Sequence, residues 1–297
     1  MNSQSPILSR VASSNTSSRI VARTRSGLAT AILAIAASVA LPAHARGQQL
    51  AVDQIELFLT PGDPSQSSRV FNVSNEGSTT LQATLYTADW DRDSVGNNRF
   101  FPTGTLKRSC RSLIQIFPTQ MQLDPHSSQA VRVTLAGPDS LSSSCWSIVF
   151  VELRDPVRLQ SAGRAVQAIV RVGTKIYVEP RSAQRSADIQ DMRVVAHEPT
   201  ADELSASKTD TAAKDVLLTV ENAGGVQVRP SGRLEIRKAD NSIAATVKIE
   251  EFPLLPGGTR QLHVPIPTLV PGKYIALAIL DYGGADIAGG QVEIQMP

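Results

Sequence analysis

From residue 50 onward, the sequence consists of short apolar and polar alternations separated by turn residues, with almost no helical periodicity. Alternation with a period of two is typical of β-strands that bury one face. Short strands separated by frequent turns predict an all-β chain built from sandwiches. The connections contain residues that favour turns, as in Thr60-Pro61-Gly62-Asp63-Pro64 and Asp124-Pro125-His126.

The predicted strands fall into two groups, each of the size of one immunoglobulin-like unit. The first group is predicted at residues 52–59, 69–74, 80–89, 113–118, 130–135, 146–153 and 165–178. The second group is predicted at residues 189–196, 216–222, 232–237, 243–249, 258–264, 273–281 and 290–295. We therefore expect two tandem immunoglobulin-like β-sandwich domains, at 46–182 and 183–297, joined by a polar hinge at 181–186. The charged stretch 197–214 is predicted to be a loop.

The N-terminal residues 1–45 have the features of a secretory signal. Four arginines and no acidic residue precede an apolar run at 28–41, and Ala43-His44-Ala45 fits the small-residue rule for cleavage. The alternative is an uncleaved anchor, but the run of about 14 residues is shorter than the about 20 needed to span a bilayer. The mature chain is therefore expected to be exported to the periplasm and not to span the membrane.

The charge of the mature chain is close to neutral. Removing residues 1–45 takes away four of the 29 basic residues and none of the 27 acidic ones, which leaves 25 basic residues. A nearly neutral chain without a basic block lacks the electrostatic footprint of a nucleic-acid-binding protein.

The two cysteines, Cys110 and Cys145, lie in the first predicted domain. In an oxidising compartment a disulfide between them would close a loop of about 35 residues and stabilise the fold by about 3–4 kcal/mol. Two buried free thiols are the alternative. His126, His197 and His263 are scattered and no C-x-x-C spacing is present, so no metal site is expected.

Sequence motifs for catalysis are absent. The chain contains no G-x-S-x-G, H-E-x-x-H or Walker A motif, and its glycine pairs lie where β-turns are predicted. We therefore expect a protein that is not an enzyme and uses no cofactor, with a hydrolase of unrecognised site as the alternative.

Residues 163–180, GRAVQAIVRVGTKIYVEP, are predicted to form one long strand that ends at a proline. Its even-numbered apolar side chains share one face, and Gln167, Arg171, Lys175 and Glu179 share the other. A strand of this length raises the question of its pairing partner.

Several stretches resemble the PapD-like periplasmic chaperones that assemble pili. Residues 69–75 (RVFNVSN) are similar to the second strand of that family, and residues 123–133 (LDPHSSQAVRV) to its L-x-P-G-x-x-x-x-V-R hairpin, with His126 in place of the glycine. Residues 146–154 (WSIVFVELR) are similar to the strand before the long loop, and residues 281–284 (DYGG) to the terminal turn. The long strand at 163–180 matches the last strand of the first domain of the family. The resemblance covers almost all of residues 50–297.

This resemblance implies a chaperone that lends its long strand to a pilus or fimbrial subunit and delivers the subunit to an outer-membrane usher. By position, Val166, Ala168 and Val170 match the donor side chains, and Lys175 matches the lysine that binds the terminal carboxylate of the subunit. The alternative is that these apolar side chains face their own core, which we expect for Val172, Ile176 and Val178.

The first strand departs from the family pattern. Gln54 stands where the family has an arginine that shares the carboxylate with the lysine, and Arg171 is the candidate substitute. The pair Cys110 and Cys145 is also unlike the family pattern. Two other functions stay open: a structural or adhesive surface protein that uses the domains as spacers, and an accessory domain of an envelope enzyme.

Overall fold

A computed structural model describes residues 49–161, 164–198 and 214–296 of the chain. The predicted signal at 1–45 lies outside the described residues, as does most of the loop predicted at 197–214. In the described part of the chain, the regular structure consists of β-strands without any helix, which confirms the all-β prediction. No helical segment there has the length and apolarity of a bilayer crossing.

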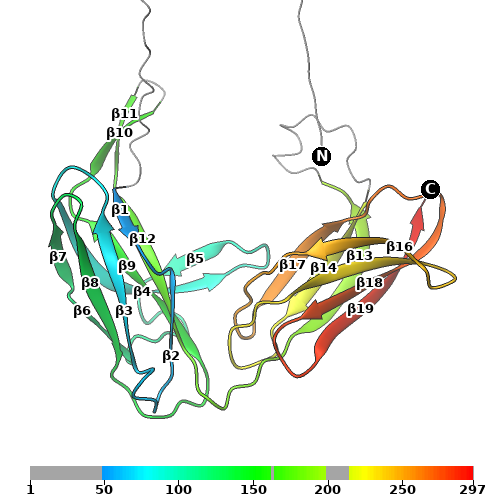
Figure 1. Cartoon of the computed structure of the whole chain (residues 1–297), viewed down its shortest axis with the longest axis horizontal. Helices are drawn as coiled ribbons and strands as arrows, with labels where there is room; N and C mark the ends of the chain where they lie inside the picture. Colours follow the sequence, from blue (N-terminus) through cyan, green and yellow to red (C-terminus); the bar gives the residue numbers. More distant parts are fainter. Residues whose placement is uncertain (1–48, 162–163, 199–213, 297) are drawn as a thin grey trace, which may run out of the picture. The chain divides into compact units, whose positions relative to one another are not determined.

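The first twelve strands form a sandwich of two main sheets (Figure 1). They are β1 (Leu50–Val52), β2 (Glu56–Leu59), β3 (Ser68–Asn75), β4 (Leu81–Arg92), β5 (Asn98–Phe101), β6 (Ile114–Phe117), β7 (Gln120–Leu123), β8 (Ser128–Leu135), β9 (Cys145–Leu153), β10 (Val157–Ser161), β11 (Arg164–Ala168) and β12 (Arg171–Val178). One sheet has the order β1-β3-β8-β6, and the other has the order β2-β12-β9-β4-β5 with β7 paired to β4. The strands β10 and β11 form a separate two-stranded sheet.

Alternate residues of these strands fill the core of the first sandwich. Phe71, Val73, Val131 and Val133 come from one sheet and Val149 from the other, and all are fully buried. Because one face of each sheet is apolar, the two sheets pack face to face and remove these side chains from water.

The first predicted strand, 52–59, is two strands that belong to different sheets. β1 pairs with β3, whereas β2 pairs in parallel with β12. Between β1 and β2, the Asp53 carboxylate accepts hydrogen bonds from the backbone N–H and the side-chain amide of Asn72, both at 2.7 Å. These bonds fix the point at which the chain leaves one sheet for the other.

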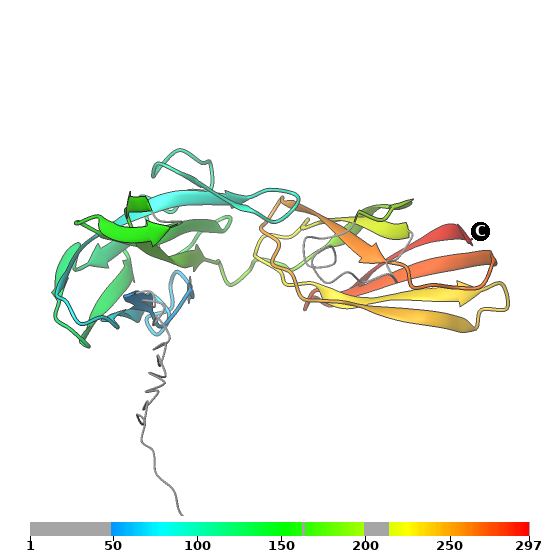
Figure 2. The same ribbon diagram turned by 90° about the horizontal axis from the view of Figure 1, so that it is seen from above.

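The remaining seven strands form a second sandwich, whose layers are visible in Figure 2. They are β13 (Asp188–Ala196), β14 (Lys214–Glu221), β15 (Ser231–Lys238), β16 (Ile243–Ile249), β17 (Thr259–Pro265), β18 (Gly272–Asp281) and β19 (Ile287–Met296). The sheet β13-β14-β17 packs on the sheet β16-β15-β18-β19 around a core that includes Val216, Leu218, Leu234, Ile236 and Leu280.

Sheet pairing among the described strands never crosses from β1–β12 to β13–β19. Each group also has its own apolar core. The expectation of two immunoglobulin-like sandwiches is therefore confirmed, while the domain boundary at residues 182 and 183 stays a prediction.

The cysteine prediction is confirmed. Cys110 and Cys145 form a disulfide, with an S–S distance of 2.10 Å and both residues buried. It joins the first residue of β9 to the segment before β6, and both cysteines belong to the core of the first sandwich.

Candidate functional site

In the structure, the predicted long strand at 163–180 is divided into two strands. Each of them pairs antiparallel with one of the two strands that precede them in the chain. β11 pairs with β10, where Val157 lies opposite Ala168, and β12 pairs with β9, where Glu152 lies opposite Arg171. Between these two pairs, the four residues 153–156 lie opposite only two residues, Ile169 and Val170. This unequal number is an irregularity of the bulge type. The hairpin of β10 and β11 projects beyond the ends of the neighbouring strands (Figure 1).

One backbone edge of this segment has no pairing strand among the described residues. β12 pairs with β9 along its whole length, but its pairing with β2 begins only at Lys175, and β11 pairs with β10 alone. The Lys175 N–H donates to the Ile55 carbonyl at 2.9 Å, away from β9. Because backbone groups alternate along a strand, the N–H and C=O groups of Arg171 and Gly173 point to this same side. We call this side of residues 164–173 the open edge.

The predicted donor side chains lie in different environments. Ile176 and Val178 are fully buried in the core of the first sandwich, and Val172 packs against it, as predicted. Val170 also packs against this core and is half-buried, and Ala168 is half-buried. The side chain of Val166 lies outside the described ones. The prediction that Val166, Ala168 and Val170 are donor side chains therefore stays a prediction.

Ile169 was not singled out by the alternation, yet it is 65% exposed beside the open edge. The signal in the sequence is the run Ala168-Ile169-Val170, in which three consecutive apolar residues interrupt the alternation. Such an interruption is expected where a strand bulges, because one residue then changes face.

The sheet face opposite the core carries a second apolar cluster, which we call the aromatic layer: Trp90, Trp146, Phe150, Tyr177 and Tyr86, with Ala88, Ile148 and Leu255 packed among them. Trp90 is fully buried, and its ring meets that of Tyr177 edge-on at 6.0 Å. Trp146 Nε1 donates to the Trp90 carbonyl at 2.9 Å.

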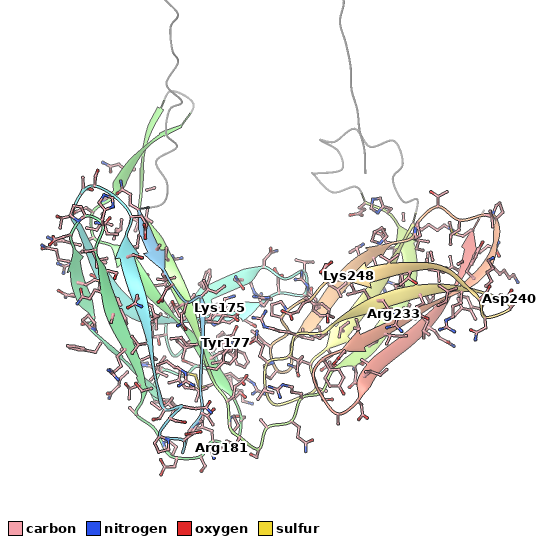
Figure 3. All side chains as sticks on the ribbon, in the orientation of Figure 1. Lys175, Tyr177, Arg181, Arg233, Asp240 and Lys248 are labelled. Carbon is pink, nitrogen blue, oxygen red and sulfur yellow. A yellow bond between two sulfur atoms is a disulfide. The ribbon has the colours of Figure 1, made fainter. Side chains whose placement is uncertain are left out.

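Lys175 lies on this outer face of β12, where Figure 3 labels it together with Tyr177. Its Nζ atom is 4.4 Å from the centroid of the Trp90 ring, a cation–π contact. Among the described residues, none forms a hydrogen bond or an ion pair with Nζ. Burial, and then repulsion from Arg92, lower the pKa of Lys175 below its ordinary value, against the attraction of Glu56.

The carboxylate of Glu56, the nearest acidic group on β2, is occupied by other partners. It accepts a hydrogen bond from the Tyr177 hydroxyl at 3.2 Å and pairs with the Arg229 guanidinium. Burial and this carboxylate raise the pKa of Tyr177 well above its usual range, so Tyr177 stays a neutral donor. Among the described residues, Lys175 Nζ therefore has no carboxylate within ion-pair distance, although Glu56 attracts its charge.

The two other residues predicted to bind the carboxylate, Gln54 and Arg171, have other contacts. Gln54 is exposed, and its backbone carbonyl accepts a hydrogen bond from the Thr174 hydroxyl at 2.8 Å. Arg171 stacks over Phe150 at 4.5 Å and over Phe100 at 5.8 Å. The charges that act on Lys175 come from Arg92, Glu56 and Arg229 instead. The roles of Gln54 and Arg171 in carboxylate binding stay predictions.

Within the described part of the chain, no group of three or more His, Cys, Asp or Glu side chains is arranged to hold a metal ion.

No protein-family model matches the chain. No curated protein matches it either.

Solved structures match the chain in fold. The class 5 fimbriae chaperone CfaA is 13% identical, over 84% of this chain and 99% of that chain, with a TM-score of 0.44. A chain from the chaperone–tip adhesin complex of CFA/I fimbriae biogenesis is 12% identical over the same shares, with a TM-score of 0.46. A chain from the CsuC–CsuE chaperone–tip adhesion subunit complex of Acinetobacter baumannii is 13% identical, over 83% of this chain and 98% of that chain, with a TM-score of 0.40. The likeness to these three structures is one of fold.

Proposed function

We propose that this chain is a periplasmic chaperone that caps pilus or fimbrial subunits by donating the open edge of residues 164–173 to a subunit that lacks a strand. The observation that carries the proposal is the pairing of β12, which has β9 on one side along its whole length and β2 on the other only from Lys175 onward.

An open edge of this kind suits strand donation for a physical reason. Its unpaired N–H and C=O groups are a template for another strand, and natural proteins usually cover or shorten such edges to prevent aggregation. Here the edge is long and carries the exposed Ile169. A partner strand would satisfy the backbone groups and bury apolar side chains at about 1–2 kcal/mol each.

Lys175 gives the proposed pairing an end point. It stands where β2 begins to pair, and its half-buried Nζ has no counter-ion within ion-pair distance among the described residues. A terminal carboxylate of the bound subunit would supply that counter-ion through charge-assisted hydrogen bonds. Export to the periplasm and delivery to an outer-membrane usher are proposed from the predicted signal at 1–45 and from the sequence resemblance.

The experiment is co-purification of the tagged chain from the periplasm of its native host, with identification of the proteins that accompany it. We expect subunits with an incomplete immunoglobulin-like fold. The variant Lys175→Ala should recover at least tenfold less subunit, as expected for the loss of a charge-assisted hydrogen bond. Lys248→Ala, which removes an exposed lysine on β16, is the matched control and should recover the wild-type amount.

Two variants of Arg171 separate the backbone edge from the side chain. Arg171→Pro removes an N–H group that points to the open edge and leaves the ladder with β9 intact, whereas Arg171→Ala removes only the side chain. We expect subunit recovery to fall in Arg171→Pro and to stay in Arg171→Ala. Ile169→Asp is a second test of the edge, with Ile243→Asp, another exposed isoleucine, as its control.

The proposal would be overturned if Lys175→Ala, Arg171→Pro and Ile169→Asp each recovered as much subunit as the wild type. An extended monomer that recovers no subunit at all, retained on the outer surface, would instead support a structural or adhesive spacer.

A further inference from the structure

Arg92, at the end of β4, is a second cation on the aromatic layer. Its guanidinium lies 5.8 Å from the centroid of the Trp90 ring, the same ring that Lys175 Nζ contacts at 4.4 Å. Arg92 and Trp90 are two residues apart on one strand and therefore share its face. In the sequence, this shared face corresponds to the spacing of Trp90 and Arg92 on either side of Asp91.

The hydrogen-bond partners of the Arg92 guanidinium are neutral, and only the backbone N–H of Arg92 donates to a carboxylate, that of Asp91. One Nη atom donates to the Asn98 side-chain oxygen at 3.1 Å, and the other lies 3.5 Å from the Pro253 carbonyl. Its Nε atom is buried without a partner in the described chain. The neighbouring carboxylate of Asp91 pairs with Arg99, at 3.5 Å. Among the described residues, no carboxylate neutralises Arg92.

Two like charges that share one buried ring repel each other, and the chain keeps both. This repulsion is the second cause, after burial, of the lowered pKa of Lys175. Glu56, the carboxylate that attracts Lys175, is paired with Arg229, so neither Lys175 nor Arg92 has an ion-pair partner among the described residues. Two such cations beside one ring favour an added anion, because the anion offsets their repulsion and accepts their hydrogen bonds.

We propose that Arg92, rather than Gln54 or Arg171, is the second cation that binds a carboxylate together with Lys175. The inference rests on the proposed function, because the carboxylate is that of the bound subunit. The proposed residue differs from the one expected from the sequence resemblance. The family has an arginine in the first strand, where this chain has the exposed Gln54, and Arg92 on β4 would supply the positive charge instead.

A binding test uses two synthetic peptides that alternate valine with serine, one ending in a free carboxylate and the other in an amide. The wild type should bind the free acid more tightly than the amide by about tenfold. Arg92→Gln and Lys175→Gln should each abolish that preference and leave binding of the amide unchanged. Arg171→Gln and Gln54→Ala are the controls and should keep the preference.

The outcomes separate this inference from the proposed function. If the wild type prefers the acid and Arg92→Gln keeps that preference, the assignment of Arg92 is wrong and the proposed function stands. If the wild type binds both peptides equally, the carboxylate site itself is wrong. If it binds neither peptide, strand donation and the inference both fail.

A second measurement needs no ligand. The pKa of Lys175, followed by NMR of the side chain, should rise in Arg92→Gln because a like charge is removed, and should stay unchanged in Arg171→Gln. A pKa that does not move in Arg92→Gln would overturn the inference. The free energy of unfolding of each variant shows whether the fold is intact.

Discussion

His126, in the turn between β7 and β8, has a backbone conformation that favours glycine. Its φ is 56°, in the left-handed region, and its side chain is exposed. The family hairpin that this segment resembles has glycine at this position. Left-handed backbone costs a non-glycine residue about 1–2 kcal/mol.

We predict that His126→Gly stabilises the chain by about 0.5 kcal/mol, because the relief of the backbone exceeds the about 0.4–1 kcal/mol lost to the greater freedom of glycine in the unfolded state. Urea unfolding followed by tryptophan fluorescence measures the effect, since both tryptophans, Trp90 and Trp146, lie in the first sandwich. His126→Ala keeps the strained backbone and should show no gain. A loss of stability in His126→Gly would contradict the prediction.

Lys175 gives carboxylate binding a defined pH dependence. Burial and then Arg92 lower its pKa in the free chain, and a bound carboxylate raises it again by favouring the charged form. Below the lowered pKa, affinity for the carboxylate peptide should not change with pH. Above it, affinity should fall, because binding then requires uptake of a proton. The measurement is titration at a series of pH values, and an equal fall in Lys175→Gln would contradict the assignment.

At the scale of elements, the strands with several alternations were predictable, as was the four-residue β6, whereas three other short strands were not. β5, β7 and β10 were missed, since four or five residues give too few alternations to separate a strand from a loop. The break between β1 and β2 was also missed, because it depends on the contact of Asp53 with Asn72 across the sheet. Such contacts join residues far apart in sequence.

The long strand was predictable in place but not in detail. Its core-facing residues, Ile176 and Val178, follow directly from the alternation. The division into β11 and β12 depends on the register of the opposite strands, which the sequence of one strand does not contain. Lys175 was found from the resemblance, whereas the cation–π contacts of Arg92 and Lys175 with Trp90 require the folded sheet.

Gly173 in β12 tests the packing of the outer sheet face. A Cβ atom at this position would lie 2.6 Å from Ile148 Cδ1 and 3.1 Å from a ring carbon of Phe150. Gly173→Ala should therefore destabilise the chain by about 1–3 kcal/mol. Gly289→Ala, in β19, is the matched control, because only the Ala278 carbonyl oxygen lies within reach there, at 3.9 Å. Unfolding is followed by circular dichroism, and equal stability of the two variants would contradict the account.

At the scale of the whole molecule, the disulfide belongs to the core of the first sandwich, which is distinct from that of the second. Replacing both cysteines by alanine opens a loop with a sequence separation of 35 and should cost the first sandwich about 3–4 kcal/mol. Tryptophan fluorescence should report this loss, and a reductant should reproduce it in the wild type. Unchanged unfolding of the double variant would show that the disulfide adds nothing to stability.

The central claim is that the open edge is unpaired in the free chain and paired in the complex. Amide hydrogen exchange of Arg171 and Gly173, measured by NMR, tests it most directly, with Lys175 as the internal reference because its N–H already bonds to Ile55. We predict fast exchange of Arg171 and Gly173 in the free chain, strong protection when the subunit is bound, and protection of Lys175 in both states. Protection of Arg171 and Gly173 in the free chain, or fast exchange of both in the complex, would contradict strand donation.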